Sequence, residues 1–283
     1  MLKQIKQITV LSACLSCFGF TSITHEFNWT DINTREVIRW DGDTAIIEQG
    51  SSAQELGCTI KLNQKEIDFA IESFGIPEQW ITISYSNEED LKVKQNALEN
   101  KTRLHGIKML GEENQFIVDY AWVIQQSTPH VKDAARQIRN AARKLGYRSK
   151  RELVGAIASF TQSLRYQIPP DHRINSEGEK ILTAGALMPL DSLDKKWGDC
   201  DSKCLLFASL LRSINLADVC FIIIDDHLFA GIQLIPEQDD YTVRHRGKEW
   251  VLVEASDAWP LGRIPLNHHT GIIKGKYTIV DLP

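Results

Sequence analysis

The sequence has few of the features that mark nucleic-acid-binding or phosphate-binding proteins. Lys and Arg are outnumbered by Asp and Glu, the formal net charge is −5 and the pI is near 5.9. A protein with this charge lacks the basic surface that neutralises a phosphate backbone. No glycine-rich phosphate-binding motif occurs either. We therefore expect no nucleic-acid partner.

Cysteine is also scarce, with six residues in 283, of which Cys14 and Cys17 lie near the N-terminus. The remaining four are too few for a disulfide framework in a chain of this size: Cys58, Cys200, Cys204 and Cys220. No pair of them has the CxxC spacing and companion histidines of a zinc site, so we expect no metal and no cofactor. Cys204 and Cys220 are expected to be small buried side chains.

The N-terminal apolar run is too short to cross a membrane comfortably. It covers residues 8–20, which is 13 residues, and follows Lys3 and Lys6. A basic start, a short apolar run and small polar residues after it are typical of a secretory signal peptide, here residues 1–24. We therefore expect export, for example to the periplasm. The letters LSAC at 11–14 also resemble a bacterial lipobox, so a membrane anchor is expected only if Cys14 is lipidated. The alternative is an N-terminal helix of the folded protein.

Residues 25–125 are mostly extended in pattern and contain no motif that suggests chemistry. Alternating apolar residues and Asp-Gly or Gly-Ser turns predict four short strands, and apolar spacing predicts a helix. A polar stretch follows that is a helix or a linker. This region is expected to be a β-containing accessory domain, with strands at 37–40, 44–47, 58–62 and 79–85, a helix at 65–74 and the polar stretch at 87–103.

Residues 126–283 have helical patterns first and strand patterns afterwards, which predicts an α+β fold with an antiparallel sheet. The expected helices cover 129–145, 149–164 and the stretch that begins at Cys200, with a loop at 167–180 between them. The expected strands cover 219–224, 227–234 and 250–254.

The letters WGDCDSKC at 197–204 place Cys200 where a loop becomes a helix. Gly198 allows a tight backbone approach, while Asp199 and Asp201 are typical of helix N-termini. Backbone amides at a helix start stabilise a thiolate and an oxyanion, so Cys200 is a candidate nucleophile. The two aspartates are expected to cap the helix, and their charge opposes a low thiol pKa.

A nucleophilic thiol needs a base, and the base needs a partner that fixes its tautomer. His227 begins one predicted strand and Glu254 ends another, so the two side chains can meet beside Cys200. Alternatives are that His227 belongs to a solvated turn, or that Glu254 is a surface charge and Asp257 is the acid instead.

The order of these pieces resembles the bacterial branch of the transglutaminase-like superfamily of papain-related cysteine enzymes, over roughly residues 130–265. The resemblance rests on PLDSL at 189–193, WGDCD at 197–201, LLRS at 210–213, His227 at a strand start and WVLVEAS at 250–256. It implies a papain/transglutaminase-like core in which Cys200 is the nucleophile, His227 the base and Glu254 the orienting acid. Glu254 stands where Asp is commoner in the family.

We therefore predict an exported transglutaminase-like cysteine peptidase or amidase that acts on a protein or peptide through a thioester. Hydrolysis is preferred over acyl transfer to an amine, and residues 126–283 are the predicted catalytic domain. Trp197 either binds substrate or packs beside the site. His268 and His269 are expected as a loop pair, with metal binding as the alternative. The competing hypothesis is a binding or assembly protein that keeps the fold without turnover.

Overall fold

The computed structural model describes residues 21–283 apart from 34, 42–43, 51–52, 111–114 and 226. Most of the predicted signal peptide, residues 1–24, and Cys14 lie outside the described residues, whereas residues 22–24 begin the first strand. None of the helices in the described part of the chain combines the length and the apolar character that a membrane span requires.

The first half of the chain contains seven strands, two α-helices and a short 3-10 helix in the described residues. In order these are β1 (Ser22–Asp31), β2 (Arg35–Asp41), β3 (Thr44–Gly50), β4 (Gln54–Asn63), α1 (Gln64–Ser73), β5 (Ile76–Pro77), η1 (Glu78–Ile81), α2 (Glu88–Arg103), β6 (Ile107–Leu110) and β7 (Gln115–Val118). The strands predicted near 37–40, 44–47 and 58–62 and the helix near 65–74 are thus confirmed, and the polar stretch at 87–103 is a helix.

The strand predicted at 79–85 is wrong. Its first residues form η1, and the remainder has no regular structure. The alternation that suggests a strand comes from Trp80, whose ring packs edge-on against His105 and beneath the ammonium of Lys101, 3.2 Å from the ring centroid. The aromatic residue is therefore held by α2 and the turn after it, and needs no neighbouring strand.

The second half contains the long helices and the main sheet, and it has the predicted order. Its elements are α3 (Tyr120–Ser127), α4 (Lys132–Lys144), α5 (Lys150–Ser163), β8 (Arg165–Tyr166), β9 (His172–Ile174), β10 (Lys180–Leu182), α6 (Pro189–Lys195), β11 (Trp197–Gly198), α7 (Cys200–Ser213), β12 (Val219–Ile224), β13 (His227–Ile232), β14 (Thr242–His245), β15 (Lys248–Val253), α8 (Leu266–Ile273) and β16 (Thr278–Asp281). The loop predicted at 167–180 carries β9 and leads into β10, which pairs with β5.

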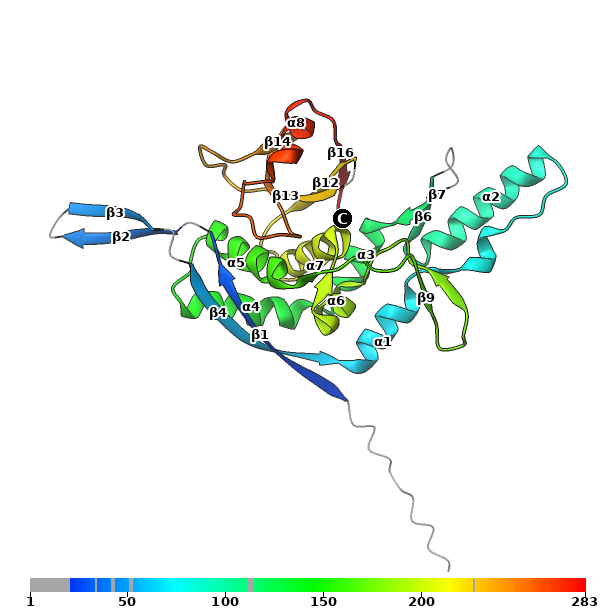
Figure 1. Cartoon of the computed structure of the whole chain (residues 1–283), viewed down its shortest axis with the longest axis horizontal. Helices are drawn as coiled ribbons and strands as arrows, with labels where there is room; N and C mark the ends of the chain where they lie inside the picture. Colours follow the sequence, from blue (N-terminus) through cyan, green and yellow to red (C-terminus); the bar gives the residue numbers. More distant parts are fainter. Residues whose placement is uncertain (1–20, 34, 42–43, 51–52, 111–114, 226) are drawn as a thin grey trace, which may run out of the picture.

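Three layers surround the buried core (Figure 1). The five-stranded sheet, in the order β14-β15-β13-β12-β16, is antiparallel throughout and covers one side of α7. Helices α4, α5 and α7 form the middle layer, and the β1–β4 ribbon packs on α4 and α5 from the other side. The α+β class with helices followed by an antiparallel sheet is therefore correct.

One hydrophobic core extends from the N-terminal ribbon into the helices. Phe27 and Trp29 of β1 lie edge-on to Phe160 of α5, with ring centroids 5.1 and 5.3 Å apart. Strand alternation places both aromatic rings on the same face of β1, and that face is buried. In the structure, β1 and β4 contribute to the same core as α4, α5 and α7. The division into an accessory domain at 25–125 and a catalytic domain at 126–283 therefore stays a prediction.

Candidate active site

Helix α7 begins at Cys200 because Asp199 caps it. The Asp199 carboxylate accepts hydrogen bonds from the Ser202 amide at 3.0 Å and the Ser202 hydroxyl at 2.6 Å. A side chain on Gly198 would place its Cβ 2.8 Å from the Ser202 Cβ, so the approach to the helix requires glycine. The cap predicted for Asp199 and the tight approach are both present, and they fix Cys200 in the first turn. The cap predicted for Asp201 is wrong, because Asp201 lies inside the first turn of α7.

Two cysteines one turn apart connect α7 to the start of β13. Cys200 and Cys204 lie on the same face of α7, and both contact the backbone of Leu228. The Leu228 amide donates to the Cys200 sulfur, and the Cys204 thiol donates to the Leu228 carbonyl at 3.3 Å. Since Leu228 directly follows His227, these contacts join the start of β13 to the first turn of α7.

His227 and Glu254 form a hydrogen-bonded pair. His227 Nε2 lies 2.7 Å from Glu254 Oε2, and the Glu254 side chain is 1% exposed. The other oxygen, Oε1, accepts from the Ser256 amide at 2.7 Å and the Ser256 hydroxyl at 2.6 Å. Asp257, the rival acid, is exposed and accepts a bond from the Ala258 amide instead. The acid that contacts the candidate base is therefore Glu254.

The surroundings of Glu254 stabilise its charged carboxylate. Burial raises the pKa of its carboxyl, but the hydrogen bond and charge of His227 and the bonds from Ser256 outweigh burial and leave the pKa below its ordinary value. An ionised Glu254 accepts a proton-bearing Nε2, so in the neutral imidazole Nδ1 is the basic nitrogen. This tautomer leaves the Nδ1 lone pair as the site at which His227 can accept a proton.

The Cys200 thiol is protonated near neutral pH. Burial raises its pKa to about 12, with the negative charges of Asp201 and Asp199 adding to burial and the amides of Leu228 and Asp201 opposing it. The thiol also faces Asp201 Oδ1 at 4.0 Å, and none of the hydrogen bonds among the described residues joins it to His227. A helix N-terminus favours a thiolate, but here burial, together with the carboxylates of Asp201 and Asp199, outweighs that effect.

Asp201 links the thiol to a neighbouring hollow. Burial, with the charge of Asp199, raises the pKa of Asp201 to about 6, although a hydrogen bond from the Tyr120 hydroxyl and the nearby His227 oppose the rise. Asp201 and Tyr120 together line a hollow of about 510 Å³. Its other walls come from η1, β7, β9 and β10, with Phe116, Ile117, Asp171, His172 and Leu182 among the lining residues.

Two aromatic residues lie on the strand pair that leads into α7. Tyr166 and Gly198 are register partners in the parallel β8–β11 pair, which places Tyr166 beside Trp197 of the neighbouring strand. Tyr166 is 52% exposed, yet partial burial, with the nearby ionisable groups of Cys200 and Asp199, raises the pKa of its hydroxyl. Trp197 is half-buried, with the Lys195 ammonium 5.6 Å from its ring centroid. Tyr166 therefore faces the site.

Lys203 is a buried cation next to the candidate triad. It is 0% exposed, and its ammonium donates to the Ser256 carbonyl at 2.9 Å and the Gln162 carbonyl at 3.2 Å. Burial lowers its pKa to about 8, against the stabilising charges of Glu254 and Asp257. Its only sequence signal is a charged residue directly before the apolar run 204–211, and this signal was not enough to predict a buried position. Tyr120 and Tyr166 gave no comparable signal.

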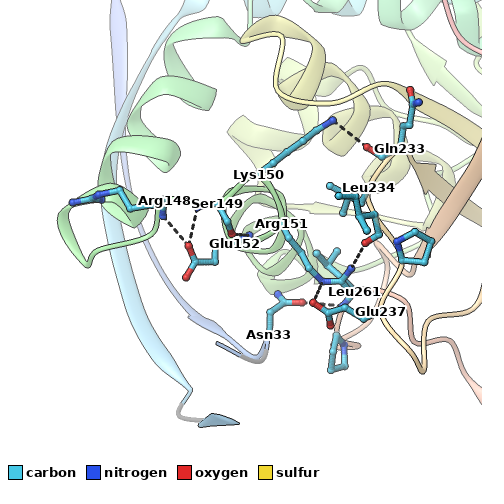
Figure 2. Close-up of a pocket in the computed structure, with 13 residues that line it drawn as sticks. Asn33, Arg148, Ser149, Lys150, Arg151, Glu152, Gln233, Leu234, Glu237 and Leu261 are labelled. Carbon is cyan, nitrogen blue, oxygen red and sulfur yellow. Dashed lines mark hydrogen bonds and ion pairs between the residues drawn. The ribbon is translucent and has the colours of Figure 1, made fainter. Parts of the chain in front are cut away.

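A larger hollow of about 910 Å³ lies at the N-terminus of α5 (Figure 2). Its charges are matched by other groups of the chain. Arg151 donates to both oxygens of Asp240, at 2.8 and 2.9 Å, and lies 3.0 Å from Glu237. The Lys150 ammonium donates to the Gln233 carbonyl at 3.0 Å. None of the candidate catalytic residues lines this hollow, although it is the larger of the two.

The remaining cysteines behave as packing residues. Burial raises the pKa of Cys58 to about 11 and that of Cys220 to about 12, and Cys204 is fully buried. The four cysteines among the described residues are free thiols. Groups of three or more Cys, His, Asp and Glu side chains with a metal-binding arrangement do not occur in this part of the chain. Comparisons with protein-family models, curated proteins and solved structures find no match to this chain.

Proposed function

We propose that this protein is a transglutaminase-like cysteine peptidase or amidase, with Cys200 as nucleophile, His227 as base and Glu254 as orienting acid. The observation that carries the proposal is the His227–Glu254 pair at 2.7 Å, held by Leu228 against the helix turn that presents Cys200. Neither a surface turn nor a structural cysteine requires a buried carboxylate at this position. The sequence resemblance to the transglutaminase-like superfamily, with its papain-like core, supports the same assignment.

The proposed reaction begins with a protonated thiol, because the pKa of Cys200 lies far above neutral pH. As the sulfur attacks the amide carbonyl, its proton moves to Nδ1 of His227, and Glu254 stabilises the imidazolium through Nε2. The amine leaves with that proton, and a thioester remains on Cys200. Water then attacks the thioester with His227 again as base, which releases the carboxylic acid and restores the thiol.

The hollow beside Asp201 is the proposed binding site for a protein or peptide substrate. It adjoins Cys200 through Asp201, and its lining combines Tyr120 and Phe116 with the backbone edge of β7. Unpaired backbone groups at a strand edge can bind an extended peptide, and the apolar side chains can hold alternate residues of it. Tyr166 and Trp197 would contact the substrate at the rim.

Peptide hydrolysis with purified protein tests this proposal. A library of acylated peptides is incubated with the wild type, and mass spectrometry identifies cleaved or deamidated products. Cys200→Ala should remove all turnover, and His227→Ala should lower kcat/KM by about 10³. Cys58→Ala is the matched control because Cys58 lies in β4 and its loss removes a thiol without touching the site. Turnover that survives Cys200→Ala contradicts the assignment.

An electrophilic peptide probe separates the enzyme from a binding protein that keeps the fold without turnover. The probe should label Cys200 faster than Cys58, and His227→Ala should remove the difference, because the base makes the thiolate only during attack. Equal labelling of wild type and His227→Ala would support a non-catalytic protein. Adding an amine to the hydrolysis assay distinguishes acyl transfer, which yields an amide, from the preferred hydrolysis.

Export to the periplasm, or an equivalent compartment, is part of the proposal and rests on residues 1–24. Expression of the full chain in a bacterium, followed by N-terminal sequencing of the mature protein, tests it. A mature N-terminus after the apolar run supports a signal peptide. Lipid on Cys14 would identify a lipoprotein, whereas an intact N-terminus in the cytosol contradicts export.

A further inference from the structure

His268 of α8 is stacked on the candidate base. The rings of His227 and His268 are nearly parallel, with an interplanar angle of 9° and centroids 4.9 Å apart. Phe229 lies edge-on to both rings, with centroids at 4.6 Å from His227 and 5.4 Å from His268. His227 and Phe229 alternate along β13 and so share one face of the sheet. The candidate base is thus enclosed by two aromatic neighbours and by Glu254.

His269, the next residue, has a different role. Its Nε2 lies 3.0 Å from the Ile264 carbonyl and its Nδ1 lies 2.8 Å from the Tyr241 hydroxyl. A carbonyl only accepts, so Nε2 carries the proton and Nδ1 accepts from tyrosine. Both ring nitrogens of His269 are therefore used to attach α8 to the preceding segment. This attachment holds His268 in place over His227.

We propose that His268 is a positioning residue that fixes the ring plane of His227 and opposes protonation of that ring before the thiol proton is transferred to it. This inference rests on the function proposed above. The stack restricts rotation of the His227 ring, so Nε2 stays on Glu254 and Nδ1 stays available as the base. Two imidazolium rings face to face repel each other, so a proton on His268 opposes a proton on His227.

The other groups that face His227 act in the opposite direction. Glu254, directly after β15, bonds to the His227 ring, and Asp201 of α7 lies near it; the negative charges of these carboxylates favour the imidazolium. His268 is a positively chargeable group stacked on the His227 ring, and its Nε2 lies 3.2 Å from Asn267 Nδ2. As the pH falls, His268 protonation therefore reduces the ability of His227 to accept the thiol proton, and activity should fall more steeply than for a single ionisation.

Replacing the ring tests the two effects separately. His268→Phe keeps the stacked ring and removes the charge, and His268→Ala removes both. His245→Phe is the control. His245 Nε2 lies 2.9 Å from Asp281 Oδ1, and His245 is not part of the His227–His268 stack. Proton–nitrogen NMR of labelled protein follows the titration and tautomer of His227, and peptide assays give kcat and KM against pH.

In His268→Phe, the His227 titration should move to higher pH by about half a unit, which is a threefold change in the protonation constant. The fall of kcat/KM at acid pH should then have the slope expected for a single ionisation. His268→Ala should lower kcat about tenfold with little change in KM, and phenylalanine should restore most of that loss. An unchanged His227 titration and acid limb in His268→Phe would overturn the proposal. The NMR titration needs no turnover, so an inactive wild type would contradict only the proposed function.

Discussion

The two hollows of this protein differ in how their charges are matched. In the larger one, Arg151 is bonded to both oxygens of Asp240, and Glu237 lies beside it. In the smaller one, Asp201 has no Lys or Arg partner among the salt bridges of the described residues, and burial raises its pKa to about 6. Matched charges hold loops together, whereas a shifted pKa beside a nucleophile indicates chemistry. Volume alone would select the hollow that none of the candidate catalytic residues lines.

The partly exposed Arg151 and the buried Lys203 show the same contrast. Arg151 is paired with carboxylates, so its charge is neutralised where it lies. Lys203 donates only to two backbone carbonyls, and burial lowers its pKa to about 8. A buried lysine of this kind can support the nearby charge of Glu254 without pairing with it directly. Substitutions on the two sides of the comparison should therefore have different readouts.

The largest expected effect is on turnover, from Glu254→Gln. An amide at this position offers His227 a weaker acceptor, and it can bind the wrong tautomer of the ring. We expect kcat/KM to fall by about 10³ with a small change in KM, measured with any peptide cleaved by the wild type. Asp257→Asn is the matched control, since Asp257 is exposed and does not contact His227. An equal loss in both variants would contradict the role of Glu254.

Lys203→Ala should produce the largest loss of stability. The change removes a buried side chain and leaves the carbonyls of Gln162 and Ser256 without this donor, for an expected loss of about 3 kcal/mol in the free energy of unfolding. Because the folded-state pKa is lowered to about 8, the contribution of Lys203 is complete above about 10.5 and is lost as the pH falls through 8. Urea unfolding should thus show a wider gap between wild type and variant at pH 9.5 than at pH 7. A constant gap would contradict the shifted pKa.

Much of the site was predictable because its signals are local. Asp199, a residue typical of helix N-termini, predicts the cap that places Cys200 in the first turn of α7. The strand patterns place His227 at the start of β13 and Glu254 directly after β15. The α+β order was predictable for the same reason, because helix and strand periods are visible in short windows of sequence.

Contacts between distant segments were not predictable from one sequence. Tyr120 bonds to Asp201 and His268 stacks on His227 only because the fold brings α3 and α8 to the start of α7 and β13. The strand predicted at 79–85 was wrong for a related reason: alternation reports which side chains are buried, and Trp80 is held by Lys101 of α2. A pattern cannot identify a partner 20 residues away.

A smaller effect is expected on the matched side, from Arg151→Met. Asp240, whose side chain is 3% exposed, then loses its ion pair with the Arg151 guanidinium. It keeps the hydrogen bond from the Glu237 amide. We expect the free energy of unfolding to fall by about 2 kcal/mol, measured by urea unfolding, while kcat/KM of the folded protein stays within twofold. A tenfold loss of kcat/KM would connect the larger hollow to the reaction. Arg136→Met, in an exposed pair with Asp133, is the control for removing an arginine.

The smallest expected effect comes from Asp201→Asn, and its direction is opposite to that of the other variants. The amide keeps a group for the Tyr120 hydroxyl and removes a negative charge that helps raise the pKa of Cys200. If that pKa falls by about one unit, the thiolate fraction and the rate of iodoacetamide alkylation near pH 8 rise about tenfold.

The same variant also tests the pH dependence of stability. The pKa of Asp201 is raised to about 6 from an ordinary 3.8. Its contribution to stability is therefore complete below pH 3.8 and is lost as the pH rises through 6. The variant lacks this loss, so it should exceed the wild type by about 1 kcal/mol at pH 7 and by little at pH 4. Slower alkylation, or a variant less stable at pH 7 than at pH 4 relative to wild type, would show that Asp201 is matched in the same way as Asp240.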